Sequence, residues 1–550
     1  MKTYDVVVIG GGSTGTAVAR DCSLRGLKTL LLERSDIASA TVGACAGMIS
    51  SGFKYYNEPE ILDLCSEEVV HFNQIARHIM TKLPILFPLS DLSEMGRSGK
   101  GMSEYEKRVA ERGVPPFLII SPETALELEP MLNPNIIASG YIEEFFIDPF
   151  RLCILQARDA QKHGAEIRTY CEVIDVLQEK GQVKGVSYFN RLTGETESAL
   201  TKVVVNAAGP WAGSIAHIAG LNLDLRLNKG AHVILDRRVV NVGITVRSVD
   251  RRWIYMYPHE NTTLIGTTAL DTWDDPDQLV TTQDEIEYLL KSFEFMIPSV
   301  REARIIRTME GVRPMVPVWR VPEDEVTRGY EIIDHEKDGV SGLLSFRGGK
   351  LVMCRHMAQS VTDRICERFD IEKECRTHLE PLPGMAKDLD VRRLAKDYGV
   401  SIHALERLRA RRGTESLDVL ALTREHPEWK SYTCTCEPVM EAEVRYAIRN
   451  EFPQTLNDIR RRLRLGTGPC QGTFCTYKAA AILADELDYD GREVQTEMLD
   501  YLSERWKGKR PPIRGPGLAQ EEIVQGIYSC VGNLDQNLHA YEEKPWEEVH

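Results

Sequence analysis

The feature that most constrains the fold is a glycine-rich turn near the N-terminus. A β-branched run at residues 4–9 leads into Gly10-x-Gly12-x-x-Gly15, which opens a helical pattern. A second apolar run at residues 29–32 ends at Glu33. A strand, glycine turn, helix and strand in this order form a βαβ unit whose helix N-terminus attracts phosphate. The sequence therefore predicts a parallel α/β sheet that binds a dinucleotide.

Each glycine of this turn has its own mechanical task. Gly10 permits the tight turn, Gly12 lets the backbone approach a diphosphate, and Gly15 lets helix and strand pack closely. Glu33 is placed to bond ribose hydroxyls and would repel a 2′-phosphate. The acid in register with the glycines makes this motif much more specific than the glycines alone.

Composition sets the outer limits. The 550 residues suffice for two to four domains. A formal charge of −15 and a pI near 5.5 argue against nucleic acid as a partner. No apolar run approaches the roughly 18 residues of a membrane span, and the first strand leaves no room for a signal peptide. We therefore expect a cytoplasmic enzyme with a small-molecule substrate.

Four of the 13 cysteines form two close pairs near the C-terminus, Cys434-x-Cys436 and Cys470-x4-Cys475. Reduced thiols suit the expected compartment better than disulfides do. The second pair lies in a glycine-bearing turn, whose N–H groups can bond to the sulfurs of a cluster. Four thiolates suit an iron–sulfur centre and a structural zinc site equally. A neighbouring redox cofactor would favour the iron–sulfur centre.

The rest of the chain divides by pattern. A strand at 203–205 leads into Asn206-Ala207-Ala208-Gly209-Pro210-Trp211, and residues 215–345 alternate short β-rich runs with turns. Residues 350–369 read as helical, and Arg-rich helical segments follow from about residue 385. This order predicts a mixed sheet inserted into the dinucleotide fold, followed by a helical region.

Taken together, these residues resemble the FAD-dependent oxidoreductase family that includes D-amino-acid oxidase, and within it the large subunits of anaerobic glycerol-3-phosphate dehydrogenases. The resemblance covers nearly the whole chain. The matching segments are Val7-Val8-Ile9-Gly10-Gly11-Gly12-x-Thr14-Gly15, Ala19-Arg20-Asp21-Cys22-x-Leu24-Arg25-Gly26, Asp148-Pro149-Phe150-Arg151-Leu152, Leu192-Thr193-Gly194-Glu195-Thr196, Leu264-Ile265-Gly266-Thr267-Thr268, Gly311-Val312-Arg313-Pro314, Gly348-Gly349-Lys350-Leu351 and Glu504-Arg505-Trp506-Lys507-Gly508.

The resemblance implies an α/β fold of two parts, a Rossmann-type FAD-binding part and a mixed-sheet substrate part, with a small helical four-cysteine domain. We expect the oxidoreductase domain at 1–385, with FAD-binding segments near 1–80, 145–215 and 340–370 and substrate segments near 81–144 and 216–339. A helical linker at 386–429, an iron–sulfur domain at 430–490 and a tail at 491–550 complete the expected order. The cysteine module resembles the 2Fe–2S domain of bacterioferritin-associated ferredoxin.

The same resemblance implies two cofactors, FAD and a 2Fe–2S cluster, with zinc as the alternative at the cysteines. The expected metal ligands are Cys434, Cys436, Cys470 and Cys475. The residues expected to bind FAD are Gly10, Gly12, Thr14, Gly15, Glu33, Arg34, Val173, Ala208, Gly209, Gly348, Gly349, Lys350 and Leu351.

The implied reaction oxidises sn-glycerol 3-phosphate to dihydroxyacetone phosphate, with the C2 hydride passing to flavin N5. We expect catalytic roles for His232, Lys350 and Arg313, and substrate contacts from Lys54, Tyr55, Arg313 and Arg328. A histidine titrates near operating pH, which suits proton abstraction, and a guanidinium can grip a phosphate bidentately. His232 is our first choice as the base, with Lys350 as the alternative.

The flavin-side loop at 43–56 departs from the family pattern. Ser50 stands where the family usually has histidine, and Lys54 where it usually has arginine. Arg347 is a candidate for replacement charge, and Cys45 for a flavin contact. Because these changes lie beside the expected substrate, they leave its identity open.

Two other functions therefore remain open. The chain can carry out the same chemistry on another polyol phosphate or a 2-hydroxy acid, or act chiefly in electron transfer or as a scaffold subunit. The resemblance implies partner subunits that carry flavin or iron–sulfur groups and pass electrons to a quinone. Such partners could hold the chain at the inner face of a membrane.

Overall fold

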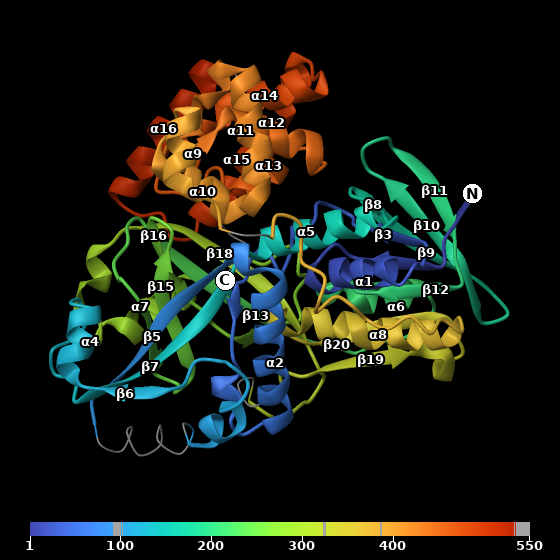
Figure 1. The fold of residues 1–550 in the computed structure, drawn as a ribbon, viewed down its shortest axis with the longest axis horizontal. Coiled ribbons are helices and arrows are strands. Elements are labelled where there is room, and N and C mark those ends of the chain that lie inside the picture. The colour runs from blue at the N-terminus through green and yellow to red at the C-terminus, as the bar shows by residue number, and fades with distance from the viewer. Residues whose placement is uncertain (92–100, 102, 323–325, 386–387, 533, 535–550) are drawn as a thin grey trace.

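The computed structural model describes residues 1–550 except 92–100, 102, 323–325, 386–387, 533 and 535–550. Three regions can be followed in Figure 1: a parallel sheet with helices, a large mixed sheet, and a group of C-terminal helices above both. No helix in the described ranges is long and apolar enough to cross a membrane.

The predicted dinucleotide unit is confirmed as the centre of a six-stranded sheet. Five strands are parallel, and β19 is an antiparallel edge strand. The strand order is β19-β20-β12-β2-β3-β8, with β19 Tyr330–Asp334, β20 Leu343–Gly348, β12 Val203–Asn206, β2 Val6–Ile9, β3 Thr29–Leu32 and β8 Glu166–Arg168. β2, β3 and β12 are buried along their whole length, as central parallel strands should be.

Helices cover this sheet, and a second small sheet extends it. On one side α1 packs against α5 and α8 (Figure 1). The helices are α1 Ser13–Leu24, α5 Pro149–Lys162, α6 Ala212–Ile218 and α8 Cys354–Arg368; the four-stranded sheet is β1 Lys2–Thr3, β11 Glu195–Leu200, β10 Gln182–Asn190 and β9 Cys171–Glu179. The predicted helices after Gly12 and after Lys350 are therefore present.

A ten-stranded mixed sheet forms the second region. Its main path is β17-β13-β16-β15-β14-β5-β7-β4, with β18 paired to β13 and β6 to β7. The bounds are β17 Leu270–Asp271, β13 Arg226–Leu235, β16 Thr262–Gly266, β15 Trp253–His259, β14 Gly243–Arg247, β5 Met80–Leu89, β7 Ala138–Ile147, β4 Met48–Ile49, β18 Ile305–Met315 and β6 Leu118–Ile120.

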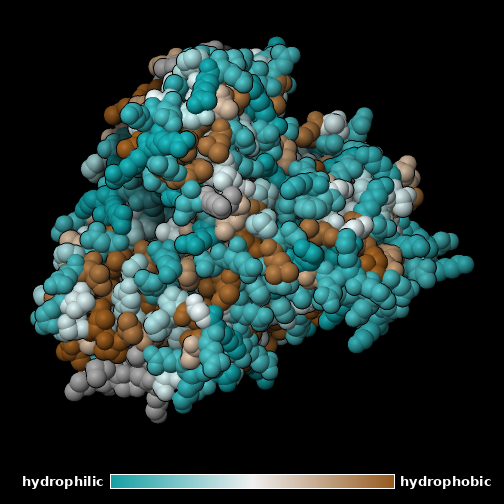
Figure 2. All heavy atoms as spheres, in the orientation of Figure 1, coloured by the Kyte–Doolittle hydropathy of each residue, from teal (hydrophilic) through white to brown (hydrophobic). Residues whose placement is uncertain are grey.

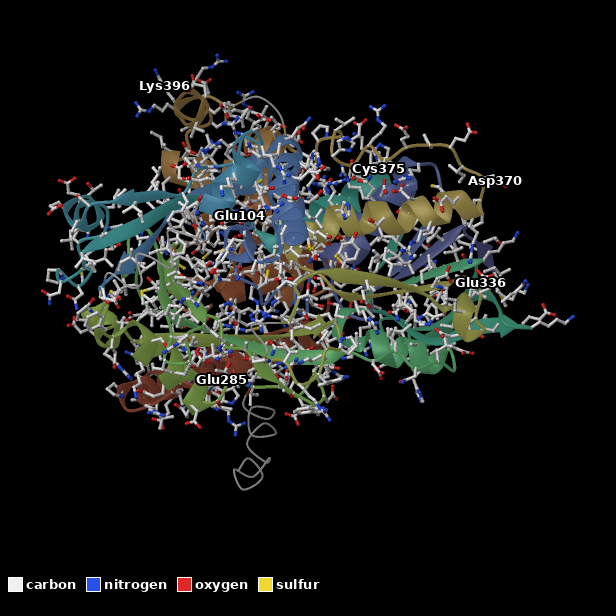
Figure 3. The ribbon with its side chains drawn as sticks, turned by 90° about the horizontal axis from the view of Figure 1, so that it is seen from below. Glu104, Glu285, Glu336, Asp370, Cys375 and Lys396 are labelled. Atoms are coloured by element: carbon white, nitrogen blue, oxygen red, sulfur yellow. The ribbon has the colours of Figure 1, made fainter. Side chains whose placement is uncertain are left out.

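Helices α2 Pro59–Ile75, α4 Pro122–Leu128 and α7 Gln283–Phe293 accompany this sheet. A capping box at Thr282 starts α7 and brings Glu285, labelled in Figure 3, under the strands. Glu285 accepts hydrogen bonds from Lys229 Nζ at 2.7 Å and Thr268 Oγ1 at 2.8 Å. This buried ion pair fixes α7 against β13.

The C-terminal region is helical. Its elements are α9 Val391–Tyr398, α10 Ile402–Arg412, α11 Ser416–Glu425, the strand pair β21 Tyr432–Cys434 and β22 Val439–Met440, α12 Glu441–Asn450, α13 Leu456–Leu463, α14 Cys475–Leu487, α15 Gly491–Lys509 and α16 Pro516–Gly532. Met498, Tyr501 and Tyr528, from the segment predicted as a tail, are buried in the same cluster as Cys434 and Cys475. The expected domain boundaries themselves stay a prediction.

Short 3-10 turns connect these elements: η1 Phe53–Tyr55, η2 Arg77–Ile79, η3 Gly209–Trp211, η4 Pro298–Glu302, η5 His335–Asp338, η6 Leu351–Met353, η7 Gly413–Glu415 and η8 Pro427–Lys430. Figure 2 shows that the face in view is mostly hydrophilic over the C-terminal helices. One of several apolar patches in this view lies near α4 and β6, where Leu118 and Ile119 are exposed.

Candidate active site

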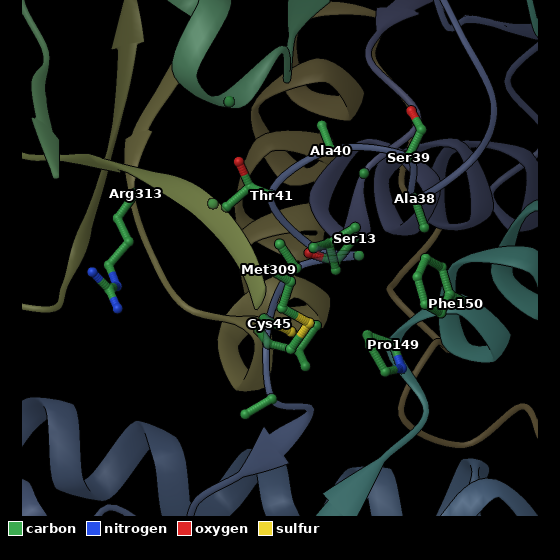
Figure 4. Close-up of a pocket in the computed structure, with 18 of the residues that line it drawn as sticks. Ser13, Ala38, Ser39, Ala40, Thr41, Cys45, Pro149, Phe150, Met309 and Arg313 are labelled. Atoms are coloured by element: carbon green, nitrogen blue, oxygen red, sulfur yellow. The ribbon is translucent and has the colours of Figure 1, made fainter. Parts of the chain in front are cut away.

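A cavity of about 3050 Å³ lies where the three regions meet. Its walls include the glycine turn, the loop from Ala38 to Ala46, the middle of β18 and the facing ends of α13 and α15. Figure 4 shows Ser13, Thr41, Cys45, Met309 and Arg313 around one part of it. The predicted residues that line it are Gly10, Gly12, Thr14, Glu33, Arg34, Lys54, Tyr55, Val173, Ala208, Gly209, Arg313, Arg328, Gly348, Gly349, Lys350 and Leu351.

The glycine turn has the shape that a dinucleotide requires. A Cβ on Gly12 would meet no atom within 4 Å, so packing within the protein does not account for this glycine. A Cβ on Gly15 would lie 1.9 Å from the Gly10 carbonyl oxygen, and Gly15 does not line the cavity. Gly12 thus leaves room for a ligand, whereas Gly15 serves helix–strand packing.

Glu33 faces the same turn from the end of β3. Its Oε2 accepts from Gly11 N at 2.6 Å and its Oε1 from Ser35 N at 2.8 Å. Burial raises the pKa of this carboxyl, and the two N–H donors oppose that rise. The carboxylate lines the cavity beside the N-terminus of α1, where ribose hydroxyls would follow a diphosphate.

Val173 and Gly209, two of the residues expected to bind FAD, line another part of the cavity. Arg34 is paired with Asp277 at 2.6 Å, and its guanidinium lies 4.1 Å from the ring centroid of Trp211. Arg34 therefore forms a cation–π contact on the cavity wall rather than a free charge. Val173, Ala208 and Gly209 line the wall beside it.

Four predicted cations line one part of the cavity. Lys54 Nζ lies 3.8 Å from the ring centroid of Tyr255, and Lys350 Nζ lies 3.6 Å from that of Tyr55. Burial lowers the pKa of Lys54 well below its usual value, and the neighbouring Lys350 and Arg328 lower it further. Among the described residues, none of the four cations Lys54, Arg313, Arg328 and Lys350 forms an ion pair with a carboxylate. The charge of this cluster suits an anionic ligand.

Arg313 is the most tightly held of the four. Its Nη1 donates to Asn228 Oδ1 at 2.7 Å, and its Nη2 donates to Thr267 Oγ1 at 3.0 Å. Burial, and then the nearby Arg328, lower its pKa to about 9. Neutral acceptors thus fix the position of the guanidinium without neutralising its charge.

His232 lies beneath the cavity wall rather than on it. Its imidazole covers Gly266, where a Cβ would lie 2.1 Å from Cδ2, and its Nδ1 is buried without a hydrogen-bond partner among the described residues. Burial, followed by the charge of Arg313, lowers its pKa to about 3, so the ring is neutral and, contrary to the expectation from the sequence, does not titrate near operating pH. Its strand β13 also carries Ile234, which does line the cavity.

The residues that depart from the family pattern have clear positions. Ser50 donates to Glu144 Oε1 at 3.1 Å and does not line the cavity. Arg347 pairs with Glu331 at 2.5 Å on the edge of the parallel sheet, so it does not supply the replacement charge that we considered. Cys45 does line the cavity, and burial raises its pKa to about 11.

The four C-terminal cysteines come together. Cys434 Sγ lies 3.5 Å from Cys436 Sγ, and further thiol contacts join Cys434 to Cys475 and Cys436 to Cys470. Backbone N–H groups of Gly472 and Phe474 point at Cys470. Within the described residues, however, no three metal-ligating side chains have the arrangement of a metal site. The donor set and its N–H groups suit iron or zinc, and the cluster stays a prediction.

Sequence reasoning missed several residues that shape the site. Tyr255 supports Lys54, and Asn228 and Thr267 hold Arg313. Thr267 lies in the segment Leu264-Ile265-Gly266-Thr267-Thr268, whose resemblance to the family indicates a role near the site. Tyr255 and Asn228 lie within β-strands with no local motif, and only the register of β13, β15 and β18 places them.

Comparison with known proteins agrees with this geometry. The family model for FAD dependent oxidoreductases matches residues 5–364, and that for the C-terminal domain of alpha-glycerophosphate oxidase matches residues 375–494. The chain belongs to the FAD-dependent oxidoreductase family.

Three similar proteins are glycerol-3-phosphate dehydrogenases or subunits of them. The chain is 34% identical to one subunit of the anaerobic glycerol-3-phosphate dehydrogenase of Escherichia coli, over 97% of this chain and 98% of that one. It is 33% identical to one subunit of the anaerobic glycerol-3-phosphate dehydrogenase of Haloferax volcanii, over 98% and 92%. The structure of the glycerol-3-phosphate dehydrogenase from Bacillus halodurans with FAD matches 94% of this chain and 97% of that one, with a TM-score of 0.75 and 25% identity.

Proposed function

We propose that this enzyme oxidises sn-glycerol 3-phosphate to dihydroxyacetone phosphate. One observation carries the proposal: the cavity wall holds four cations, none of which forms an ion pair with a carboxylate among the described residues. These cations are Lys54, Arg313, Arg328 and Lys350. A dianionic phosphate would relieve the mutual repulsion that contributes to the lowered pKa of Lys54. The names of the relatives support the same substrate.

Separate groups of residues would bind the cofactor and the substrate. Gly12 and the N-terminus of α1 would hold the diphosphate of FAD, and Glu33 its ribose. When bound, FAD supplies the acceptor of the C2 hydride at its N5. Lys54, Arg328 and Lys350 would bind the phosphate, while Arg313, held by Asn228 and Thr267, would orient the C2 hydroxyl.

His232 would take the hydroxyl proton as the hydride leaves. Its ring is neutral, and Nδ1 has no partner among the described side chains and so can accept a proton. Because the ring does not line the cavity, the substrate would have to reach it through the cavity wall, of which Ile234 and Met309 form part. Lys350 is the alternative base, since it lines the cavity directly.

The deciding experiment is an anaerobic titration of the FAD-loaded protein with sn-glycerol 3-phosphate, followed at the flavin absorbance. We expect bleaching at stoichiometric substrate and none with glycerol, which lacks the phosphate. No bleaching by sn-glycerol 3-phosphate, in protein whose flavin dithionite still reduces, would exclude this substrate. Other polyol phosphates and 2-hydroxy acids would then be tested, and a failure of all would favour a role in electron transfer or as a scaffold.

We further propose that Cys434, Cys436, Cys470 and Cys475 bind a 2Fe–2S cluster that passes electrons to partner subunits and a quinone. The relatives are named as subunits, which supports partners of this kind. Such partners would also hold the chain at the inner face of a membrane. Iron and sulfide analysis with electron paramagnetic resonance of the dithionite-reduced protein tests the cluster. Stoichiometric zinc without iron would contradict it, and Cys470→Ser should lose the signal while FAD stays bound.

A further inference from the structure

The segment Glu504-Arg505-Trp506-Lys507-Gly508 near the end of α15 has no part in the proposed reaction. It brings α15 against β18: Thr308 Oγ1 donates to the Gly508 carbonyl at 3.1 Å. A Cβ on Gly508 would lie 2.7 Å from Arg307 Nε. Glycine therefore lets the helix approach the strand closely enough for its neighbouring charges to meet those of β18.

Three cations from the elements of this contact line the cavity: Arg307 from β18, Arg460 from α13 and Lys507 from α15. Arg307 and Lys507 both lie near Glu310. Arg307 Nη2 donates to the backbone carbonyl of Glu504 at 3.3 Å, and Arg460 Nη2 lies 3.9 Å from the Glu504 carboxylate. Within the described ranges, neither Arg307 nor Lys507 forms an ion pair. The Glu504 side chain is 48% exposed, so water weakens its pairing.

The charges of this contact are poorly balanced. Burial, and then Arg307, lower the pKa of Arg460 to about 10, and burial lowers the pKa of Arg307. The nearby carboxyl of Glu310 bonds to Thr281 Oγ1 at 2.8 Å, and burial raises its pKa. Two desolvated guanidinium groups, from β18 and α13, therefore repel each other, and the half-exposed Glu504 carboxylate offsets this cost only in part.

We propose that a phosphate-class oxyanion binds between Arg307, Arg460 and Lys507, where β18 meets α13 and α15. The two guanidinium groups can each donate two parallel hydrogen bonds to phosphate oxygens, and the ammonium adds a compact positive charge. Arg313, in the expected substrate site, lies six residues from Arg307 on the same strand, or about 20 Å. The oxyanion site is therefore distinct from the substrate site.

Such an anion would bridge the substrate sheet and the C-terminal helices. It can come from two sources, free phosphate or a phosphomonoester from solution, because the diphosphate of FAD is assigned to the glycine turn at Gly12. In either case the anion stabilises the folded protein, because it binds the folded state and not the unfolded chain.

The test measures binding of inorganic phosphate to the full-length protein by calorimetry and by the rise in Tm. An Arg328→Gln background weakens the substrate site, and FAD-loaded and FAD-free forms are compared. We expect Arg307→Gln and Arg460→Gln each to weaken phosphate binding about tenfold or more and to reduce the rise in Tm at the same phosphate concentration. Arg304→Gln is the matched control, since Arg304 is an exposed arginine just before β18, and it should bind as the parent does.

Binding of phosphate that persists in the FAD-loaded form supports a separate oxyanion site, and binding seen only without FAD overturns it, because the flavin would then occupy these cations. The proposal is overturned if both arginine variants bind phosphate like the parent, or if the parent binds none in either form. Should Arg460→Gln fail to fold, Lys507→Gln takes its place. Bleaching of the flavin by sn-glycerol 3-phosphate, measured on Arg307→Gln without the background change, reports the proposed function independently.

Discussion

At the scale of single residues, aromatic rings rather than carboxylates hold two of the cations of the candidate active site. Lys54 lies over Tyr255 and Lys350 over Tyr55. A cation–π contact stabilises an ammonium by about 0.5–2 kcal/mol without neutralising it. The charge therefore stays available to an anionic substrate. A carboxylate partner would instead compete with the substrate for the ammonium.

Lys54 should contribute to substrate binding through this charge. We expect Lys54→Met to lower kcat/KM for sn-glycerol 3-phosphate by roughly 10- to 150-fold, since a charged hydrogen bond contributes about 1.5–3 kcal/mol. Lys54→Arg should retain most of the activity. Lys184→Met, at an exposed position on β10, is the control. Steady-state kinetics decides this, and an unchanged kcat/KM in Lys54→Met would remove Lys54 from the site.

His232 should act as a neutral base over the whole physiological range. Because its pKa is about 3, almost all of the imidazole is already in the neutral, proton-accepting form at pH 5, well below the ordinary histidine pKa of about 6.5. The rate of flavin reduction should therefore show no loss between pH 8 and pH 5 from this residue. Stopped-flow measurements across that range test this; a fall centred near pH 6.5 would point to a base in an ordinary environment.

Replacing the ring gives a second test of the same residue. We expect His232→Asn to slow flavin reduction by roughly 10²- to 10⁴-fold while FAD stays bound. If His232→Asn reduces its flavin at the parent rate, the imidazole has only a packing role over Gly266, and Lys350 becomes the leading candidate for the base.

At the scale of elements, the glycines of the β2–α1 turn differ in what they serve. Gly12 has open space where a Cβ would lie, and Gly15 has the Gly10 carbonyl oxygen only 1.9 Å away. The first glycine therefore makes room for a ligand, and the second allows α1 to pack on β2. Their substitutions should fail in different ways.

We expect Gly12→Ala to keep a folded protein that binds FAD much more weakly, and Gly15→Ala to lower the stability of the fold itself. Gly491→Ala, at the start of α15 with open space around it, is the matched control. FAD content after purification and Tm of the FAD-free protein separate the two effects. Full FAD occupancy in Gly12→Ala would contradict a diphosphate at this turn.

How much the sequence could predict depends on how local the signal is. The strand, glycine turn and helix around Gly12 follow from neighbouring residues, and so do the strand at Val203 and the helix after Lys350. The sequence could predict that the pairs containing Cys434 and Cys470 lie together, because closely spaced thiols are chemically distinctive metal ligands. Spacing predicted their meeting but could not predict whether they bind iron or zinc.

The supports of the active site could not be predicted in this way. Tyr255 meets Lys54 and Asn228 meets Arg313 only through the register of a ten-stranded sheet. Arg347 looked available in the sequence, yet Glu331 on the adjacent strand pairs with it. Such contacts depend on long-range strand pairing, which single-sequence patterns do not encode.

At the scale of the whole molecule, buried ion pairs join the C-terminal helices to the flavin region. Asp36, just after β3, accepts from Arg462 Nη2 at 2.8 Å and from Arg461 Nε at 2.7 Å. Arg151 of α5 pairs with Glu451 at 2.9 Å, and Arg464 with Asp148 at 3.3 Å. Because α13 leads directly into the Cys470 loop, these pairs hold the cysteines at a fixed position relative to the cavity.

Removing one partner of such a pair should cost far more than the pair itself contributes. Asp36→Asn leaves the buried Arg462 without its carboxylate partner and leaves Arg461 with Asp458 alone, for which we expect a loss of about 3–5 kcal/mol in the free energy of unfolding. Burial raises the pKa of Asp36, but Arg462 and Arg461 outweigh this and hold it below its usual value. The contribution of the carboxylate should therefore be complete at pH 7 and be lost only as the pH falls below about 3.9.

Urea unfolding of the FAD-free protein at pH 7 and pH 5, with Asp277→Asn as the exposed control, measures this contribution. We expect the same large difference between the parent and Asp36→Asn at both pH values, because the carboxylate stays ionised across that interval. A difference that disappears by pH 5 would mean that the pKa of Asp36 in the folded protein is raised rather than lowered, and that the interface does not depend on its charge. A separate, earlier transition in Asp36→Asn would show that the pair chiefly docks the C-terminal helices, since those helices would then unfold before the sheets.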